Sequence, residues 1–349
     1  MSPKTLLAEL AEGRLLPPEQ ARRIADYERL KPFSVHHEIR GVLYVGIGLL
    51  SAGLGWLLYE RYDQIGPSLI LAGLSLLCVG CFVMVWQNRP PVSARYVTPR
   101  STLAGPVLLL GCLLFLTIEG YAQYEYQIFG TRYGLVTLLP ALLFLALAYR
   151  FDHSGVLGLG ITALISWVGV TIRPLEFYVK GNFVDARVTA SALAVGLLLV
   201  VVAQTLNHQR LKAHFTFTYM LLAGNLLFVA LLAGLFNFET WRVPVTLGLL
   251  LACFAADRYA RQPTPNIAEL DPVNWIFLLM GAVYGFIGLT FLFFTYLPAA
   301  NTLVVALYFI AVGLVLIQYL LTAGRRFTKK QRQAAQPLTA QDVTDKSAS

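Results

Sequence analysis

The stretch PSLILAGLSLLCVGCFVMVWQ, residues 67–87, runs for 21 residues without a single Asp, Glu, Lys, Arg or His. An α-helix needs about 20 apolar residues to cross the hydrocarbon core of a bilayer, and an unpaired charge inside that core is strongly unfavourable. The stretch therefore predicts a transmembrane helix.

Similar charge-free runs lie on both sides of this stretch. The shortest of them has 14 residues, and we expect it to cross because Arg242 and Arg258 can extend their side chains to the interfaces at its two ends. The sequence predicts an all-α, polytopic membrane helix bundle of ten transmembrane helices. In chain order the ten runs are residues 41–59, 67–87, 101–118, 133–149, 155–172, 188–206, 215–236, 243–256, 275–296 and 302–321.

The composition agrees with a membrane location. Of the 349 residues, 57% are apolar and only 13% are charged, which is too few charges to cover a soluble protein of this size with a hydrated surface. We attribute the formal net charge of +8 to membrane topology and to attraction toward anionic lipid head groups. No nucleic-acid motif accompanies it, and no nucleic-acid partner is expected.

Positive charge is divided unequally between the two sides of the predicted bundle. With ten spans, both chain ends and every second loop share one side, which holds 21 Lys and Arg and 12 acidic residues. The opposite side holds six Lys and Arg and seven acidic residues. Because short basic loops stay in the cytoplasm, we expect a multi-pass protein of the bacterial cytoplasmic (inner) membrane with both termini cytoplasmic.

The chain is expected to have three segments. Residues 1–40 should form a cytoplasmic helical hairpin, because Gly13 can end a first helix and Pro18 can begin a second. Residues 41–321 form the bundle, and residues 322–349 form a basic and then disordered cytoplasmic tail. A hairpin of about 40 residues cannot build its own core. It must therefore dock on the bundle, on a second copy or on a protein partner.

The start of the chain also resembles a known family. The segments GRLLPPEQARRIADYERL (residues 13–30) and GVLYVGIGLLSAGLGWLLYERYDQI (residues 41–65) are similar to the opening of the predicted bacterial membrane proteins called domain of unknown function 2157. The chain departs from the family pattern at Arg61 and Tyr62, where the family tends to show Asn-Trp. This resemblance implies a polytopic membrane protein and brings no established activity. The matching positions are Gly13, Pro18, Glu19, Gln20, Ala21, Gly46, Gly48, Gly53, Gly55, Asp63 and Ile65.

Small residues on two of the runs predict close helix packing, because they let helix backbones approach each other. A sliding surface of a transporter is the alternative interpretation. The two small faces consist of Gly48, Ser51 and Gly55 in the first run and Gly281, Gly285 and Gly288 in the ninth.

Polar side chains are rare within the runs. Asn225 is central in the seventh run, where it could contact a neutral solute or form an interhelical hydrogen bond. The runs contain no ionisable Asp, Glu, His, Lys or Arg, which argues against a proton-coupled or ion-coupled pump. Glu119, Tyr121 and Glu125 follow the third run. We expect them in an external loop, either as an aromatic belt with solvated charges or as a rim that contacts a solute.

The sequence lacks the familiar motifs of catalysis. Cys78 and Cys81 form a Cys-x-x-Cys inside a run, where apolar burial excludes redox partners. The histidines have no zinc-motif spacing, so we predict no cofactor and no enzyme, and a metal site among them is left open. All five fall on the predicted cytoplasmic side: His36, His37, His153, His208 and His214.

A basic cluster follows the last run and is expected to bind anionic lipid head groups at the cytoplasmic face. It consists of Arg325, Arg326, Lys329, Lys330 and Arg332. Together these features favour a non-catalytic membrane scaffold or accessory subunit, with the N-terminal hairpin as the contact to a protein partner. The alternative is a permease for an uncharged or lipophilic solute.

Overall fold

The structure is a computed structural model that describes residues 20, 41–53, 56, 66–89, 91, 101, 103–130, 132–172, 186–261, 273–298 and 301–334. The chain divides into two compact units. The first unit comprises Met1–Val42, Thr264–Leu270 and Ile317–Ser349, and the second comprises Leu43–Pro263 and Asp271–Leu316. The predicted hairpin of residues 1–40 lies outside the described residues, apart from Gln20. The interactions below all belong to the second unit.

All regular structure in the described part of the chain is helical, as predicted. Nine helices there are long and apolar enough to cross a membrane, and a shorter apolar helix, Gly41–Gly53, covers part of the first predicted run. The elements are α4 (Pro67–Gln87), α5 (Ala104–Tyr126), α6 (Tyr133–Phe151), α7 (Ser154–Ile172), α9 (Ala186–His208), η1 (Ala213–Phe215), α10 (Thr216–Asn237), α11 (Arg242–Ala260), α12 (Val273–Tyr296) and α13 (Thr302–Ala334).

Local chemistry explains several helix boundaries. Gly66 has φ of +80° and Pro67 follows it in the first turn of α4, where a missing backbone N–H and a fixed φ cost nothing. Gln127 and Asp152 adopt the left-handed conformation at the ends of α5 and α6, which lets the chain leave a helix sharply. His153 accepts a hydrogen bond through Nδ1 from the backbone N–H of Val156 at 3.1 Å, so it caps the start of α7.

Two predicted boundaries need correction. The eighth run, predicted at 14 residues, lies within the 19-residue helix α11, because the helix continues through its charged ends. The third run was expected to end at Ile118, but α5 continues to Tyr126. Helix formation does not require apolar side chains, and the eight residues after Ile118 contain no Pro. The segment that was predicted as an external loop is therefore the end of a transmembrane helix.

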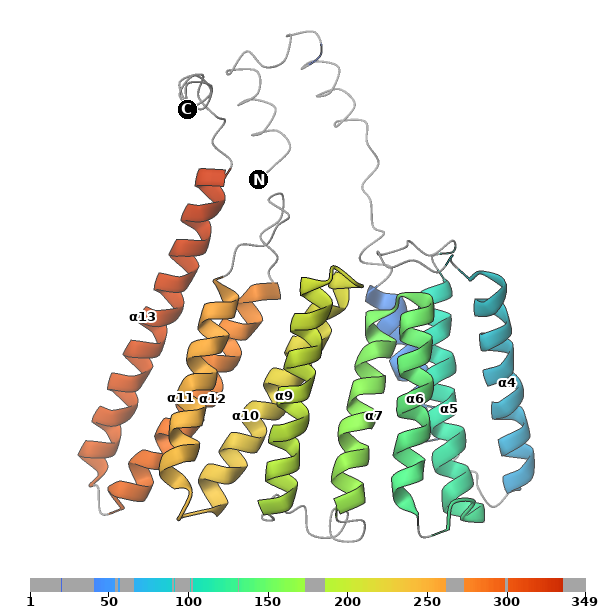
Figure 1. The fold of residues 1–349 in the computed structure, drawn as a ribbon, viewed down its shortest axis with the longest axis horizontal. Helices are drawn as coiled ribbons and strands as arrows, with labels where there is room; N and C mark the ends of the chain where they lie inside the picture. Colours follow the sequence, from blue (N-terminus) through green and yellow to red (C-terminus); the bar gives the residue numbers. More distant parts are fainter. Residues whose placement is uncertain are drawn as a thin grey trace. The chain divides into compact units, whose positions relative to one another are not determined.

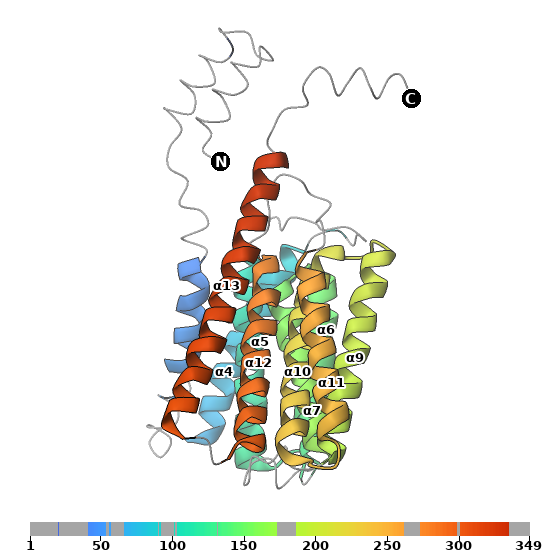
Figure 2. The ribbon, with the colours of Figure 1, turned by 90° about the vertical axis from the view of Figure 1, so that its left-hand side faces the viewer.

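Helices that are neighbours in the chain pack against each other (Figure 1). The pairs are α4 with α5, α5 with α6, α6 with α7, α9 with α10, α10 with α11, and α11 with α12. Helix α10 also contacts α7 and α12, and Figure 2 shows α10 beside α11 and α12. Large apolar side chains on the outer faces, such as Leu76, Leu251 and Leu303, are exposed, as expected for surfaces that face lipid.

Candidate functional site

The helices define two ends of the second unit. We call the end at which α6 passes into α7 the α6–α7 end, and the opposite end, at which α5 passes into α6, the α5–α6 end. Polar side chains gather at the α6–α7 end. A buried polar side chain, Glu119, lies near the α5–α6 end. The polar groups of these two places, together with Asn225 inside the bundle, are the candidates for function.

An ion-paired cluster holds the α6–α7 end together. Nζ of Lys212 lies 2.6 Å from Oδ1 of Asp152, and Nε2 of His214 lies 3.2 Å from the same oxygen. The side chain of Asp152 is 3% exposed and that of Lys212 is 12% exposed. Asp152 belongs to the turn between α6 and α7, whereas Lys212 and His214 belong to the connection between α9 and α10. The cluster therefore joins two turns that are 60 residues apart in the chain.

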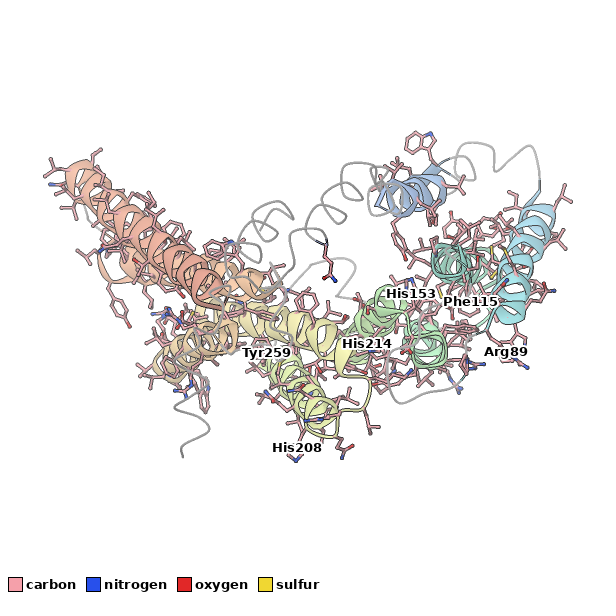
Figure 3. The ribbon with its side chains drawn as sticks, turned by 90° about the horizontal axis from the view of Figure 1, so that it is seen from above. Arg89, Phe115, His153, His208, His214 and Tyr259 are labelled. Atoms are coloured by element: carbon pink, nitrogen blue, oxygen red, sulfur yellow. The ribbon has the colours of Figure 1, made fainter. Side chains whose placement is uncertain are left out.

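The histidines of this end have structural partners. His153, in addition to capping α7, has Nε2 3.1 Å from the hydroxyl of Tyr44 in the Gly41–Gly53 helix. His153 and His214 lie at the same end of the unit, and His208 lies farther out (Figure 3). Across the described residues, no group of three His, Cys, Asp or Glu side chains is arranged to hold a metal ion. His36 and His37 lie outside those residues.

Aromatic residues pack next to the ion-paired cluster. The hydroxyls of Tyr149 on α6 and Tyr219 on α10 are 3.1 Å apart. The ring of Tyr149 also meets Phe215 edge to face, with centroids 5.2 Å apart. Phe215 is fully buried and Tyr219 is nearly so. These contacts join α6 to α10, and Phe215 also meets the His214 ring of the polar cluster with centroids 4.3 Å apart.

Asn225 is part of an interhelical hydrogen bond. Its Oδ1 accepts a hydrogen bond from the hydroxyl of Tyr284 on α12 at 2.9 Å. Its Nδ2 donates to the carbonyl oxygen of Leu221 at 3.0 Å and lies 3.9 Å from Sδ of Met280. The ring of Tyr284 stacks on Phe228 with centroids 4.9 Å apart. Both polar ends of the amide are thus engaged by protein, which corresponds to the interhelical alternative and not to a solute contact.

Glu119 lies in a different environment from the loop that the sequence predicted. It is 7% exposed and sits on α5, and neither carboxylate oxygen has a hydrogen-bond partner among the described residues. Tyr121 and Glu125, predicted in the same loop, are half-buried on the last turns of the same helix. Tyr121 packs against the cluster formed by Ile70 and Leu74 on α4.

Helical periodicity contains the signal that could have identified Glu119. Residues 112, 115, 119 and 122 follow one another at spacings of three and four, so they share one face of a helix. Apolar residues occupy the other three positions, and Cys112 and Ala122 are buried. Extending the third run by this spacing, instead of stopping at the first charge, would have placed Glu119 inside a transmembrane helix, and burial of its face is then decided by packing.

Glycines of α12 pack closely against α11. A Cβ added to Gly281 would lie 3.6 Å from Cβ of Ala256, and one added to Gly285 would lie 3.3 Å from Sγ of Cys253. A Cβ at Gly288 would overlap a methyl group of Leu249. This is the kind of close approach that small residues allow.

The small face predicted in the first run is arranged differently. An added Cβ at Gly48 would meet no atom within 4 Å, and Gly55 lies outside the described residues. The packed face of the Gly41–Gly53 helix carries Tyr44, Ile47 and Ser51. Of the predicted residues, Ser51 therefore lies on the packed face and Gly48 does not, because the helix is turned toward the bundle by its larger side chains.

Two further groups of residues singled out from the sequence lie on helices, one on α4 and one on α13. Cys78 and Cys81 are free and buried in α4, and Sγ of Cys78 lies 3.5 Å from the carbonyl oxygen of Gly111 on α5. The basic cluster at Arg325, Arg326, Lys329, Lys330 and Arg332 lies on the helical continuation of α13, which ends at Ala334. The side chains of that cluster lie outside the described part of the structure.

Comparison with known proteins confirms the family resemblance. Residues 8–157 match the model of a family described as "Predicted membrane protein (DUF2157)". The match runs from the predicted hairpin through α6 to the first turn of α7 and includes Glu119, Asp152 and His153. No protein with a curated description and no solved structure matches the chain.

Proposed function

We propose that this membrane protein is a non-catalytic scaffold or accessory subunit of the bacterial cytoplasmic membrane, with both chain ends in the cytoplasm. The observation that carries the proposal is that polar side chains on α10, α12 and α13 bind one another. Asn225 binds Tyr284, and the hydroxyls of Thr290 and Tyr308 are 2.9 Å apart. Polar groups used in this way hold helices in place and leave little chemistry for a substrate.

The distribution of charge supports the proposed orientation. Basic residues at the α6–α7 end outnumber those at the α5–α6 end in the described residues, and an excess of Lys and Arg is typical of cytoplasmic loops. The former are Arg89, Arg150, Arg210, Lys212, Arg258 and Arg261, and the latter are Arg132, Arg187 and Arg242. Two arginines of the α6–α7 end, Arg89 and Arg150, lie 5.3 and 5.9 Å from the ring of Trp86, an arrangement suited to a membrane interface.

Labelling of single introduced cysteines tests the orientation. Leu211 at the α6–α7 end and Ile128 at the α5–α6 end are both exposed, and the native Cys78, Cys81 and Cys112 are buried. A membrane-impermeant maleimide should label Ile128→Cys in spheroplasts and Leu211→Cys only after the membrane is opened. The reverse pattern, or labelling of both variants from one side, would refute the proposed orientation.

Crosslinking in native membranes tests the scaffold role. The full chain should crosslink to a specific membrane or cytoplasmic protein in a constant ratio, and deletion of residues 1–40 should abolish the adduct because the hairpin is the proposed contact. Deletion of residues 335–349 is the matched control and should leave the adduct unchanged. A full chain that forms no adduct, or one whose adduct survives loss of the hairpin, would contradict the proposal.

A permease is the second candidate, and Glu119 is the observation that favours it. A buried ionisable group inside a membrane span is by default a functional candidate, because its burial is costly. Spans without ionisable groups disfavour coupled transport, but α5 carries Glu119 within a span. Vesicles that contain the purified protein should then show saturable flux of a neutral or lipophilic solute, and Glu119→Gln should change its pH dependence. Absence of flux across a broad solute panel would eliminate this candidate.

A further inference from the structure

The carboxyl group of Glu119 is buried within the membrane part of the bundle. Helix α5 ends at Tyr126, seven residues beyond Glu119, so the carboxyl-bearing turn lies about 10 Å inside the end of the helix. Glu119 is 7% exposed, and both of its carboxylate oxygens lack a hydrogen-bond partner among the described residues. Such a group is unusual, because buried polar atoms are nearly always satisfied.

The face of α5 that carries Glu119 is otherwise apolar, and its residue Phe115 packs both against α6 and against the α4 cluster of Ile70 and Leu74. Phe115, one turn before Glu119 on this face, meets Phe144 of α6 edge to face with centroids 6.0 Å apart. Cys112 and Ala122 complete the face and are buried. Helix α5 also packs against α7. The carboxyl group thus lies on a helix face that is otherwise occupied by apolar and aromatic side chains.

Among the described residues, the neighbours of α5 place no charged side chain within hydrogen-bond distance of the Glu119 carboxylate. Helix α7 has no ionisable side chain between Ser154 and Ile172, and the nearest basic residue before α6 is the exposed Arg132. In the described part of the chain, the other titratable groups near this part of α5 are Cys78 and Cys81 on α4, Tyr133 at the start of α6, and Cys112, Tyr121, Tyr124, Glu125 and Tyr126 on α5 itself. None of them forms a hydrogen bond with Glu119 in the described residues.

An unpaired carboxylate in such a place is strongly disfavoured, and a group in this position becomes neutral instead. We propose that Glu119 is a proton-binding site inside the membrane. A proton delivered by water at the α5–α6 end forms an O–H bond with one carboxylate oxygen, and the same bond breaks when the proton returns to water. No electron transfer accompanies the step. The inference does not depend on the scaffold proposal, since a proton site can serve an accessory subunit as well as a permease.

A lipophilic carbodiimide tests for the protonated carboxyl in the full chain. Dicyclohexylcarbodiimide takes up the carboxyl proton on nitrogen, its central carbon bonds to a carboxyl oxygen, and an oxygen-to-nitrogen acyl shift gives a stable N-acylurea. Mass spectrometry of digested protein should find this adduct on Glu119 at neutral pH. Glu125→Gln on the same helix is the matched control and should leave labelling intact, whereas Glu119→Gln should abolish it. A wild-type protein that is unlabelled at Glu119 would overturn the proposal.

Infrared difference spectroscopy tests whether the proton exchanges with water. The wild-type protein in lipid should show a carbonyl stretching band of a protonated carboxyl, and transfer to D₂O should shift that band to lower frequency. The band should be absent in Glu119→Gln and present in Glu125→Gln. A wild-type spectrum without the band would show that Glu119 is ionised, and a band that fails to shift would show that the group is sealed from water. Either result contradicts a proton-binding site, and both are measured on the unmodified protein.

Discussion

Replacing Gly160 with Ala should destabilise the contact between α6 and α7. A Cβ added at Gly160 would lie 3.0 Å from the backbone nitrogen of Leu145, and 3.1 and 3.2 Å from Cγ and Cδ2 of the same residue. The side-chain atoms of Leu145 can rotate away, but the backbone nitrogen belongs to helix α6 and cannot. The two helices must therefore move apart along their shared face to accept one methyl group.

The size of the effect follows from two opposing contributions. Inserting a methyl group into a packed site costs about 1–3 kcal/mol, whereas replacing Gly by Ala inside a helix gains about 1 kcal/mol. Because the nearest atom at Gly160 is a backbone nitrogen, we take the upper part of that cost, about 2–3 kcal/mol, and expect Gly160→Ala to lower the free energy of unfolding by about 1–2 kcal/mol. Gly158 lies on the same helix, and its added Cβ would be 3.9 Å from Cγ2 of Thr218, an ordinary contact. Gly158→Ala should therefore raise the free energy of unfolding by about 0.5–1 kcal/mol.

Equilibrium unfolding in mixed micelles measures both variants. The purified protein is titrated with SDS in a mild detergent, and tryptophan fluorescence and circular dichroism report the transition. The two variants should fall on opposite sides of the wild type, separated by about 1.5–3 kcal/mol. If Gly160→Ala is as stable as the wild type, or if Gly158→Ala loses as much stability as Gly160→Ala, the close approach of α6 and α7 is not a feature of the protein.

Three further experiments test the polar contacts by the same unfolding measurement or by hydrogen exchange. A double-mutant cycle of Asn225→Ala and Tyr284→Phe should give a coupling energy of about 0.6–1.7 kcal/mol, and additivity of the two changes would disprove the interhelical bond. Lys212→Met should cost up to about 3 kcal/mol because the buried carboxylate of Asp152 loses its lysine partner while His214 stays beside it, and adding Asp152→Asn should recover most of that loss. The side chain of Gln123 binds the backbone of the α5–α6 loop twice, so Gln123→Ala should speed amide exchange in that loop, and unchanged exchange would contradict this anchor.

The helices and their membrane location follow from the sequence alone. The run 67–87 coincides with α4, and the run 133–149 falls two residues short of α6. This success has a local cause: in hydrocarbon every backbone N–H and C=O must be paired within its own segment, so a long apolar run has only the helix available. The same rule identified the membrane class from composition. The predicted end of the third run was wrong, because the run was stopped at the first charged residue whereas the helix α5 continues past it.

Only the tertiary structure decides which helix faces are buried and which polar groups meet. Glu119 and Tyr121 are two residues apart on α5, yet Glu119 is 7% exposed whereas Tyr121 is half-buried beside the α4 cluster of Ile70 and Leu74. Asp152 and Lys212 are brought together from two separate turns. The physical reason is that lipid is as apolar as the interior of the bundle, so hydrophobic periodicity does not distinguish a face that meets lipid from one that meets a neighbouring helix. Packing resolves that ambiguity, and it determines that Asn225 binds Tyr284 while the carboxyl of Glu119 is left without a partner in the described residues.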